Sequence, residues 1–140
     1  MITAYQIAIF SAGVFFLNGL LTGVWKYVQI ANSEEGKAHY YVDIAHRTSL
    51  LYSFAAILVA QFVQISQLGA TTELVATLLL VVYFAISILS YMVQGFKQET
   101  DNQLRPLTTP VRVFMWTLIA AEIGGFLVLF YGVTIALGSN

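Results

Sequence analysis

The sequence predicts an all-α fold, an integral membrane bundle of four transmembrane helices that forms one domain over residues 1–140. Hydrophobic residues make up 59% of the chain and charged residues only 9%, whereas soluble domains carry about 25% charged residues. Four apolar stretches are each longer than the roughly 20 residues needed to cross a bilayer. Too little polar sequence remains between them for a separate soluble module. The expected helices span about residues 4–30, 40–67, 73–94 and 111–137.

The first apolar stretch is expected to be a retained transmembrane helix. No basic region precedes it, and it is too long for the core of a signal peptide. Gly19 and Gly23 have the spacing that lets a second helix backbone approach closely. Because this pattern is common, ordinary packing inside the bundle is favoured over a dedicated contact between copies.

The second and third stretches are expected to form an antiparallel helical hairpin. Only the short segment around Gly69 separates them, so the third helix must return beside the second. A long polar segment, residues 95–110, follows and contains Pro106 and Pro110. It is expected to be a loop that delivers the chain to the fourth helix.

All lysine and arginine residues lie in or beside the first and third connections. Because cytoplasmic connections are enriched in basic residues, both connections are expected in the cytoplasm and both termini outside. The expected location is a membrane crossed several times, the inner membrane of a bacterium, with lipid as the immediate partner. The basic residues are Lys26, Lys37, Arg47, Lys97, Arg105 and Arg112.

Composition and motifs exclude several classes of function. The chain has no cysteine, which excludes disulfides, thiolate metal sites and covalently attached c-type haem. Its formal net charge of −1 leaves no basic patch for a phosphate backbone, so nucleic acid is not an expected partner. No nucleophile-elbow, phosphate-loop or zinc-protease motif supports hydrolytic or nucleotide-driven chemistry.

Both histidines lie where the second helix is expected to enter the membrane. His39 and His46 are seven residues apart, so on one helix they share a face and are about 10 Å apart along the axis. Two ligands so placed cannot reach one haem iron from opposite sides, and a single histidine with an open iron position is the more natural use of either. Hydrogen bonding at headgroup level explains His39. His46 is deeper, and both a structural histidine bonded to a helix carbonyl and a metal ligand are compatible with its position.

Glu122 lies inside the fourth apolar stretch, about ten residues from Arg112. An isolated carboxylate inside a membrane is costly and indicates a functional site. It is expected either to be protonated and hydrogen bonded within the bundle, or to approach Arg47, His46 or a bound ligand. Arg47 itself is expected to extend to the interface, the default for arginine near a helix end.

Phenols occur inside the second and third helices at Tyr52, Tyr83 and Tyr91. Interfacial positions or core packing explain most tyrosines of membrane proteins. Tyr91 is expected near the membrane face where His46 lies, so it is the phenol best placed to join a site there.

Short motifs distributed over most of the chain match those of a known group of membrane proteins. They comprise Gly23, Trp25, Ser33, Glu35, Gly36, Ala38, Ala45, His46, Leu51, Tyr91, Phe96, Asn102 and Leu104. In these positions the sequence resembles the styrene oxide isomerase family, small proteins of four transmembrane helices. Tyr52 and Tyr83 depart from the family pattern, which has asparagine and aspartate there.

The resemblance implies a b-type haem held between the subunits of a homotrimer. His46 would be the one protein ligand of the iron, and Arg47 would contribute to cofactor binding. The ferric iron would act as a Lewis acid that converts a small lipophilic epoxide into an aldehyde, the chemistry of an intramolecular oxidoreductase. Tyr91 would hydrogen bond the epoxide oxygen, while Tyr52 and Glu122 would shape or tune the pocket. Because of the two tyrosine departures, haem binding carries over more readily than isomerisation of styrene oxide itself.

Two other functions are compatible with the same residues. The chain could be a haem-free accessory subunit that packs through its glycine-rich helix faces against a larger membrane complex. It could also be a haem protein of electron transfer or sensing, in which Met92 or Tyr91 closes the second axial position. The visible spectrum of the purified protein separates the haem-free function from the other two.

Overall fold

The computed structural model describes residues 2–138, which form four α-helices and no strands. Each helix is long and apolar enough to cross a membrane, which confirms the predicted all-α fold of four membrane-spanning helices. The helices are α1, Ala4–Ala31; α2, Tyr40–Ile65; α3, Ala70–Lys97; and α4, Thr109–Gly138.

Helix α3 extends a few residues beyond its predicted range at both ends. It begins at Ala70 because Gly69 takes an extended conformation as the N-cap, and Glu73 places a negative charge in the first turn, where the helix dipole favours it. It ends at Lys97, a basic residue in the last turn, followed by Gln98 in the left-handed conformation with φ 53°. Charge and backbone geometry at the ends therefore lengthen the helix beyond its apolar stretch.

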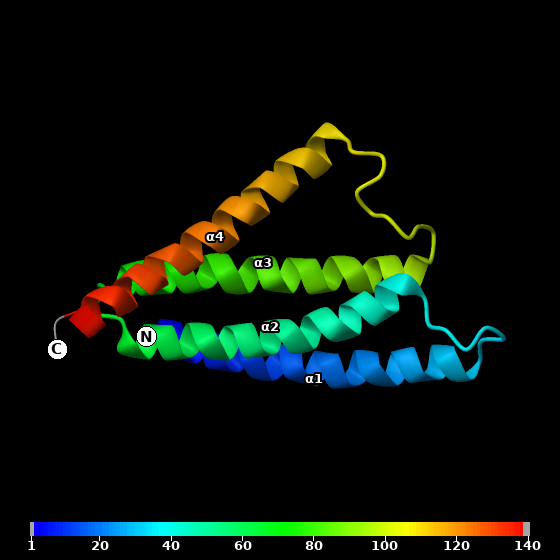
Figure 1. The fold of residues 1–140 in the computed structure, drawn as a ribbon, viewed down its shortest axis with the longest axis horizontal. Coiled ribbons are helices and arrows are strands. Elements are labelled where there is room, and N and C mark those ends of the chain that lie inside the picture. The colour runs from blue at the N-terminus through cyan, green and yellow to red at the C-terminus, as the bar shows by residue number, and fades with distance from the viewer. Residues whose placement is uncertain (1, 139–140) are drawn as a thin grey trace.

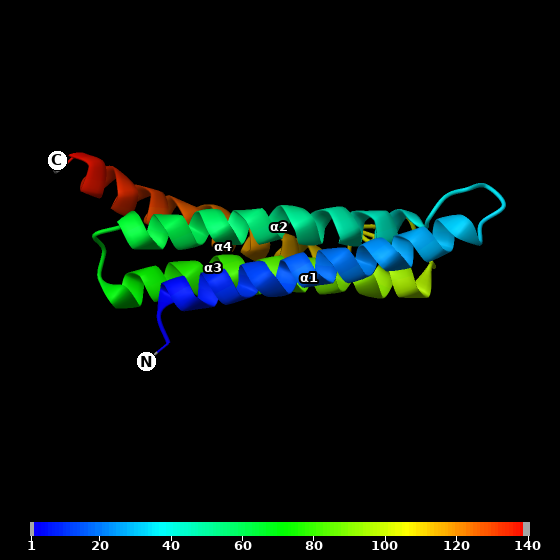
Figure 2. The same ribbon diagram turned by 90° about the horizontal axis from the view of Figure 1, so that it is seen from below.

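Helices α1, α2 and α3 lie side by side, as two perpendicular views show (Figure 1 and Figure 2). The α1–α2 and α3–α4 connections lie at one end of the bundle, and both termini lie at the other end with the α2–α3 turn (Figure 1). Among the described residues α1 and α4 make no contact, whereas α2 and α3 each contact all three other helices. Helices α2 and α3 therefore join the α1 side of the molecule to the α4 side.

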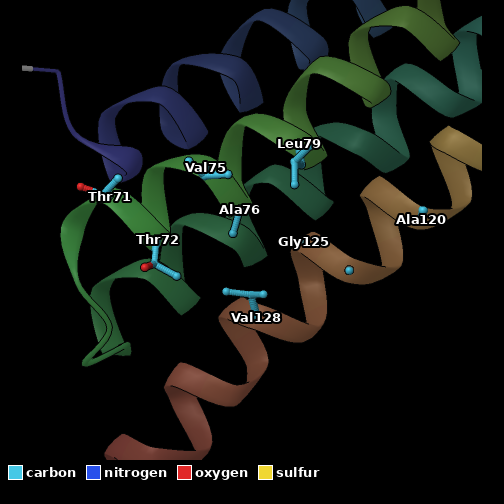
Figure 3. A pocket seen from close by; sticks show the side chains of 9 residues that line it. Thr71, Thr72, Val75, Ala76, Leu79, Ala120, Gly125 and Val128 are labelled. Atoms are coloured by element: carbon cyan, nitrogen blue, oxygen red, sulfur yellow. The ribbon is translucent and has the colours of Figure 1, made fainter.

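Helix α4 crosses the bundle at an angle, and its N-terminal half diverges from α3 (Figure 1). Gly125 lies at the crossing, where an added Cβ would come within 2.9 Å of the Ala76 carbonyl oxygen. Figure 3 shows this crossing from close by, with Ala76 facing α4. The first turns of α4 therefore bury little surface against the other helices. The buried residues of α4 are Ala121, Gly125, Leu129, Gly132, Val133 and Ala136.

Small residues let α1 and α2 pack at close range. Gly19 faces Leu50, and an added Cβ would lie 2.6 Å from the Leu50 Cδ2 atom. Gly23 faces His46 in the same way. The two glycines thus serve packing inside the bundle, the use that their spacing favours.

Candidate functional site

His46 is half-buried in the seam between α2 and α1. Its Nδ1 lies 2.8 Å from the carbonyl oxygen of Gly19. The ring lies over Gly23, where a Cβ would come within 2.9 Å of the ring Cε1 atom. Because a carbonyl oxygen only accepts, Nδ1 carries a proton, and in the neutral form of the ring the lone pair is on Nε2. The predicted bond to a helix carbonyl is therefore present, and it uses Nδ1 and not Nε2.

A carboxylate with two cations lies about one helical turn from His46, toward the polar end of the seam. The Asp43 Oδ1 atom is 2.5 Å from the Lys26 Nζ atom, and its Oδ2 atom is 2.9 Å from the Arg47 Nη2 atom. Asp43 and Arg47 are four residues apart on one helix, a spacing that favours an ion pair. Lys26 comes from α1, so this contact depends on the register between the two helices. Two cations share one carboxylate, and the trio carries a net charge of +1.

His39 forms the N-cap of α2 at the headgroup end. Its backbone N–H donates to the Gln29 side chain at 2.9 Å, and its Nδ1 accepts from the Tyr41 backbone N–H at 3.3 Å. Its Nε2 lies 3.8 Å from a carboxylate oxygen of Asp101 in the third connection. These contacts hold the start of α2 against Gln29 and the third connection. Capping and packing therefore explain why a histidine is found at position 39.

Two half-buried phenols lie between α2 and α3. The Tyr52 ring stacks on Phe84 with ring centroids 4.1 Å apart, and the Tyr91 ring stacks on Tyr41 with centroids 6.0 Å apart. The Tyr41 hydroxyl accepts a hydrogen bond of 2.6 Å from the Gln103 backbone N–H. The third connection therefore closes over the Tyr41–Tyr91 stack.

Glu122 projects from α4 into an apolar cleft against α2 and α3. Its Oε1 atom is buried and has no hydrogen-bond partner among residues 2–138. Phe84, on which the Tyr52 ring stacks, forms one wall of this cleft. The apolar walls of the cleft are Ala55, Leu58, Val59, Leu80, Phe84, Ile123, Phe126 and Leu127.

The sequence-predicted residues thus divide between two sides of α2. Tyr52, Tyr91 and Glu122 share the side of α3 and α4. His46 turns to α1, and Arg47 pairs with Asp43 rather than with Glu122. Glu122 therefore lies in a cleft beside Phe84, and neither His46 nor Arg47, the partners that the sequence offers, lines that cleft.

Asn18 of α1 is a polar residue that belongs to none of the sequence motifs. Its side-chain amide donates to the Ser49 hydroxyl at 2.9 Å and lies 3.5 Å from the Met92 sulfur. A carboxamide inside an apolar helix is a signal that could have identified it, because polar side chains hydrogen bond across membrane helices. The amide links α1 to α2 and α3, and it engages the Met92 thioether.

Within residues 2–138 no three His, Asp or Glu side chains are close enough to hold a bare metal ion. A porphyrin supplies most of the ligands of its iron, so a single donor such as His46 is sufficient for a haem. Comparison with protein-family models, with curated proteins and with solved structures finds no match. The function must therefore be inferred from the geometry of these residues.

Proposed function

We propose that the protein binds haem b in the membrane through His46 and isomerises a small lipophilic epoxide to an aldehyde. The observation that carries the proposal is the 2.8 Å contact between the His46 Nδ1 atom and the Gly19 carbonyl oxygen. Metal-ligating histidines commonly donate their second ring N–H to a backbone carbonyl, which fixes the tautomer and the direction of the ring. His46 has this arrangement, and a neutral imidazole suits iron.

The charges near His46 fit a cofactor with carboxylate side chains. Lys26 and Arg47 share Asp43, so one positive charge of the trio is unbalanced. The Arg47 side chain is 62% exposed, and a guanidinium forms strong, directional pairs with carboxylates. Arg47 is therefore the residue proposed to bind a haem propionate at the polar end of the α1–α2 seam.

The proposal includes assembly of several copies. His46 lines none of the clefts described in residues 2–138, so a group held there would need cover from a second chain. A homotrimer with haem between subunits, the arrangement implied by the family resemblance, would supply that cover. In such an assembly a phenol of one copy could serve a site whose histidine belongs to another.

When bound, haem would supply a Lewis-acidic ferric iron that polarises the epoxide oxygen. The chain would exclude water through its apolar helices and aim a hydrogen-bond donor at that oxygen. Tyr91 is the proposed donor, because such a donor stabilises the negative charge that develops on oxygen as the C–O bond breaks. Glu122 is proposed to tune the charge around Tyr52 and Tyr91; the Tyr52 ring stacks on Phe84, a wall of the Glu122 cleft.

The first test is the visible spectrum of the purified ferric protein. His46→Ala should lose most of the Soret absorbance, because it removes the proposed iron ligand. His39→Ala is the matched control and should keep the Soret band, since His39 caps α2. A Soret band that survives in His46→Ala and disappears in His39→Ala would refute the assignment.

The second test is turnover of an epoxide panel from propylene oxide to styrene oxide, with aldehyde as the measured product. Ferric and dithionite-reduced spectra would show whether the second axial position of the iron is open. Haem-replete protein that converts no epoxide would favour electron transfer or sensing. Protein that takes up no haem would favour the accessory-subunit function.

A further inference from the structure

Glu122 is a carboxylate without a cationic partner near the middle of α4. Its Oε1 atom is buried and unpaired, and no ion pair within residues 2–138 includes it. Arg112, the basic residue of the same helix, is ten positions away, about 15 Å along the axis. A carboxylate in apolar surroundings is stabilised by a proton or by a nearby cation. The described part of the chain supplies no such cation.

The cleft around Glu122 has the size and the walls of a small-molecule site. Its volume is about 310 Å³, and ligand sites range over about 300–1,000 Å³. Every lining residue other than Glu122 is apolar. Phe84 and Phe126 contribute aromatic rings, and Tyr52 extends this aromatic surface by stacking on Phe84. Aromatic faces attract organic cations.

The rim of the cleft consists of apolar side chains that face outward. Leu58, Ile123 and Leu127 are 46%, 57% and 56% exposed. In a membrane-spanning bundle these side chains meet acyl chains, so a ligand would enter from the bilayer. The ligand must therefore be lipophilic as well as complementary to a carboxylate.

We propose that this cleft binds a lipophilic organic cation, with Glu122 as its counter-ion and the aromatic rings against its apolar substituents. An inorganic cation would lack the further oxygen ligands that it requires. A neutral lipophile would leave the carboxylate unpaired. An ammonium or phosphonium with apolar substituents satisfies both the carboxylate and the walls. The site lies on the α4 side of α2, apart from His46, and does not depend on haem.

The test is equilibrium dialysis of radiolabelled tetraphenylphosphonium against the purified full-length protein in detergent. Wild-type protein should bind the cation at one site per chain. Glu122→Gln keeps the shape of the side chain without its charge and should weaken binding at least tenfold. Glu73→Gln, which removes a carboxylate from the first turn of α3 instead, is the matched control and should bind as wild type does. Glu122→Asp keeps the charge and should retain more binding than Glu122→Gln. Binding retained in Glu122→Asp would show that substitution at this position does not by itself abolish binding through misfolding.

Competition with triphenylmethanol, a neutral molecule of similar size that donates a hydrogen bond, identifies the chemistry of the ligand. Weak competition is expected, because the alcohol carries no charge. Equal competition by the alcohol would overturn the proposal in favour of a neutral hydrogen-bond donor. The proposal would also be overturned by undiminished binding to Glu122→Gln, or by the absence of binding to wild type. The presence or loss of a Soret band in the same samples reports separately on the haem proposal.

Discussion

Replacing Gly23 with alanine is expected to dislodge His46 without altering the histidine itself. The added Cβ would lie 2.9 Å from the His46 Cε1 atom and 3.2 Å from its Nδ1 atom, whereas ordinary contacts begin at 3.4 Å. The ring must therefore move by about half an ångström, and its 2.8 Å bond to the Gly19 carbonyl oxygen lengthens or breaks.

The energetic effect is clearest against a second glycine of the same helix. An alanine at Gly13 would have nothing within 4 Å of its Cβ, so Gly13→Ala gains only the helix preference of alanine, about 1 kcal/mol. Gly23→Ala gains the same preference but leaves a half-buried N–H without its acceptor, which costs up to about 1–3 kcal/mol. The propensity contribution cancels between the two variants, so Gly23→Ala should be about 1–3 kcal/mol less stable than Gly13→Ala.

Thermal unfolding in detergent and the Soret absorbance of haem-supplied protein measure the two consequences. Gly23→Ala should unfold at a lower temperature than Gly13→Ala and should take up less haem. If both variants unfold at the same temperature and take up the same haem, His46 is not seated on Gly23 and the proposed ligand geometry is wrong.

Three further predictions follow from the ion pairs, the loops and the phenols. Asp43→Asn leaves Lys26 and Arg47 side by side without their carboxylate and should destabilise the protein by about 1 kcal/mol in low-salt thermal unfolding. Glu35→Gln is the control for this variant: it removes only the exposed 3.8 Å pair with Lys37 and should leave the unfolding temperature unchanged. Single cysteines at Ser33 and Asn102 should resist an impermeant thiol reagent in intact cells, because both connections are predicted to be cytoplasmic; labelling of both from outside would reverse the orientation. Tyr91→Phe should lower epoxide turnover by about 10² to 10³ with unchanged haem content, and full activity would exclude Tyr91 as the donor.

The four helices could be predicted because each apolar stretch is long enough to span a membrane on its own. The tilt of α4 could not be predicted, because the composition of the helix does not determine the angle at which it crosses its neighbours. The tilt depends on the contact of Gly125 with the Ala76 backbone, a meeting of residues far apart in the sequence. Glu122 could be predicted as a candidate functional residue, but its place in a cleft beside Phe84 rather than next to Arg47 could not.

The α1–α2 seam shows the same division between local and long-range information. The spacing of Gly19 and Gly23 predicts close packing, and the position of His46 suggests a bond to a helix carbonyl. Only the register between the two helices shows that these are one contact, with His46 lying over Gly23 and bonded to Gly19. The Lys26–Asp43 pair depends on that same register.

His46 and Tyr52 of α2 contact different neighbouring helices. His46 contacts α1, whereas Tyr52 stacks on Phe84 of α3, a wall of the Glu122 cleft. Six residues separate them, a rise of about 9 Å, and groups at this separation without shared partners usually act independently. The His46 site and the Glu122 cleft should therefore respond separately to substitution within one chain.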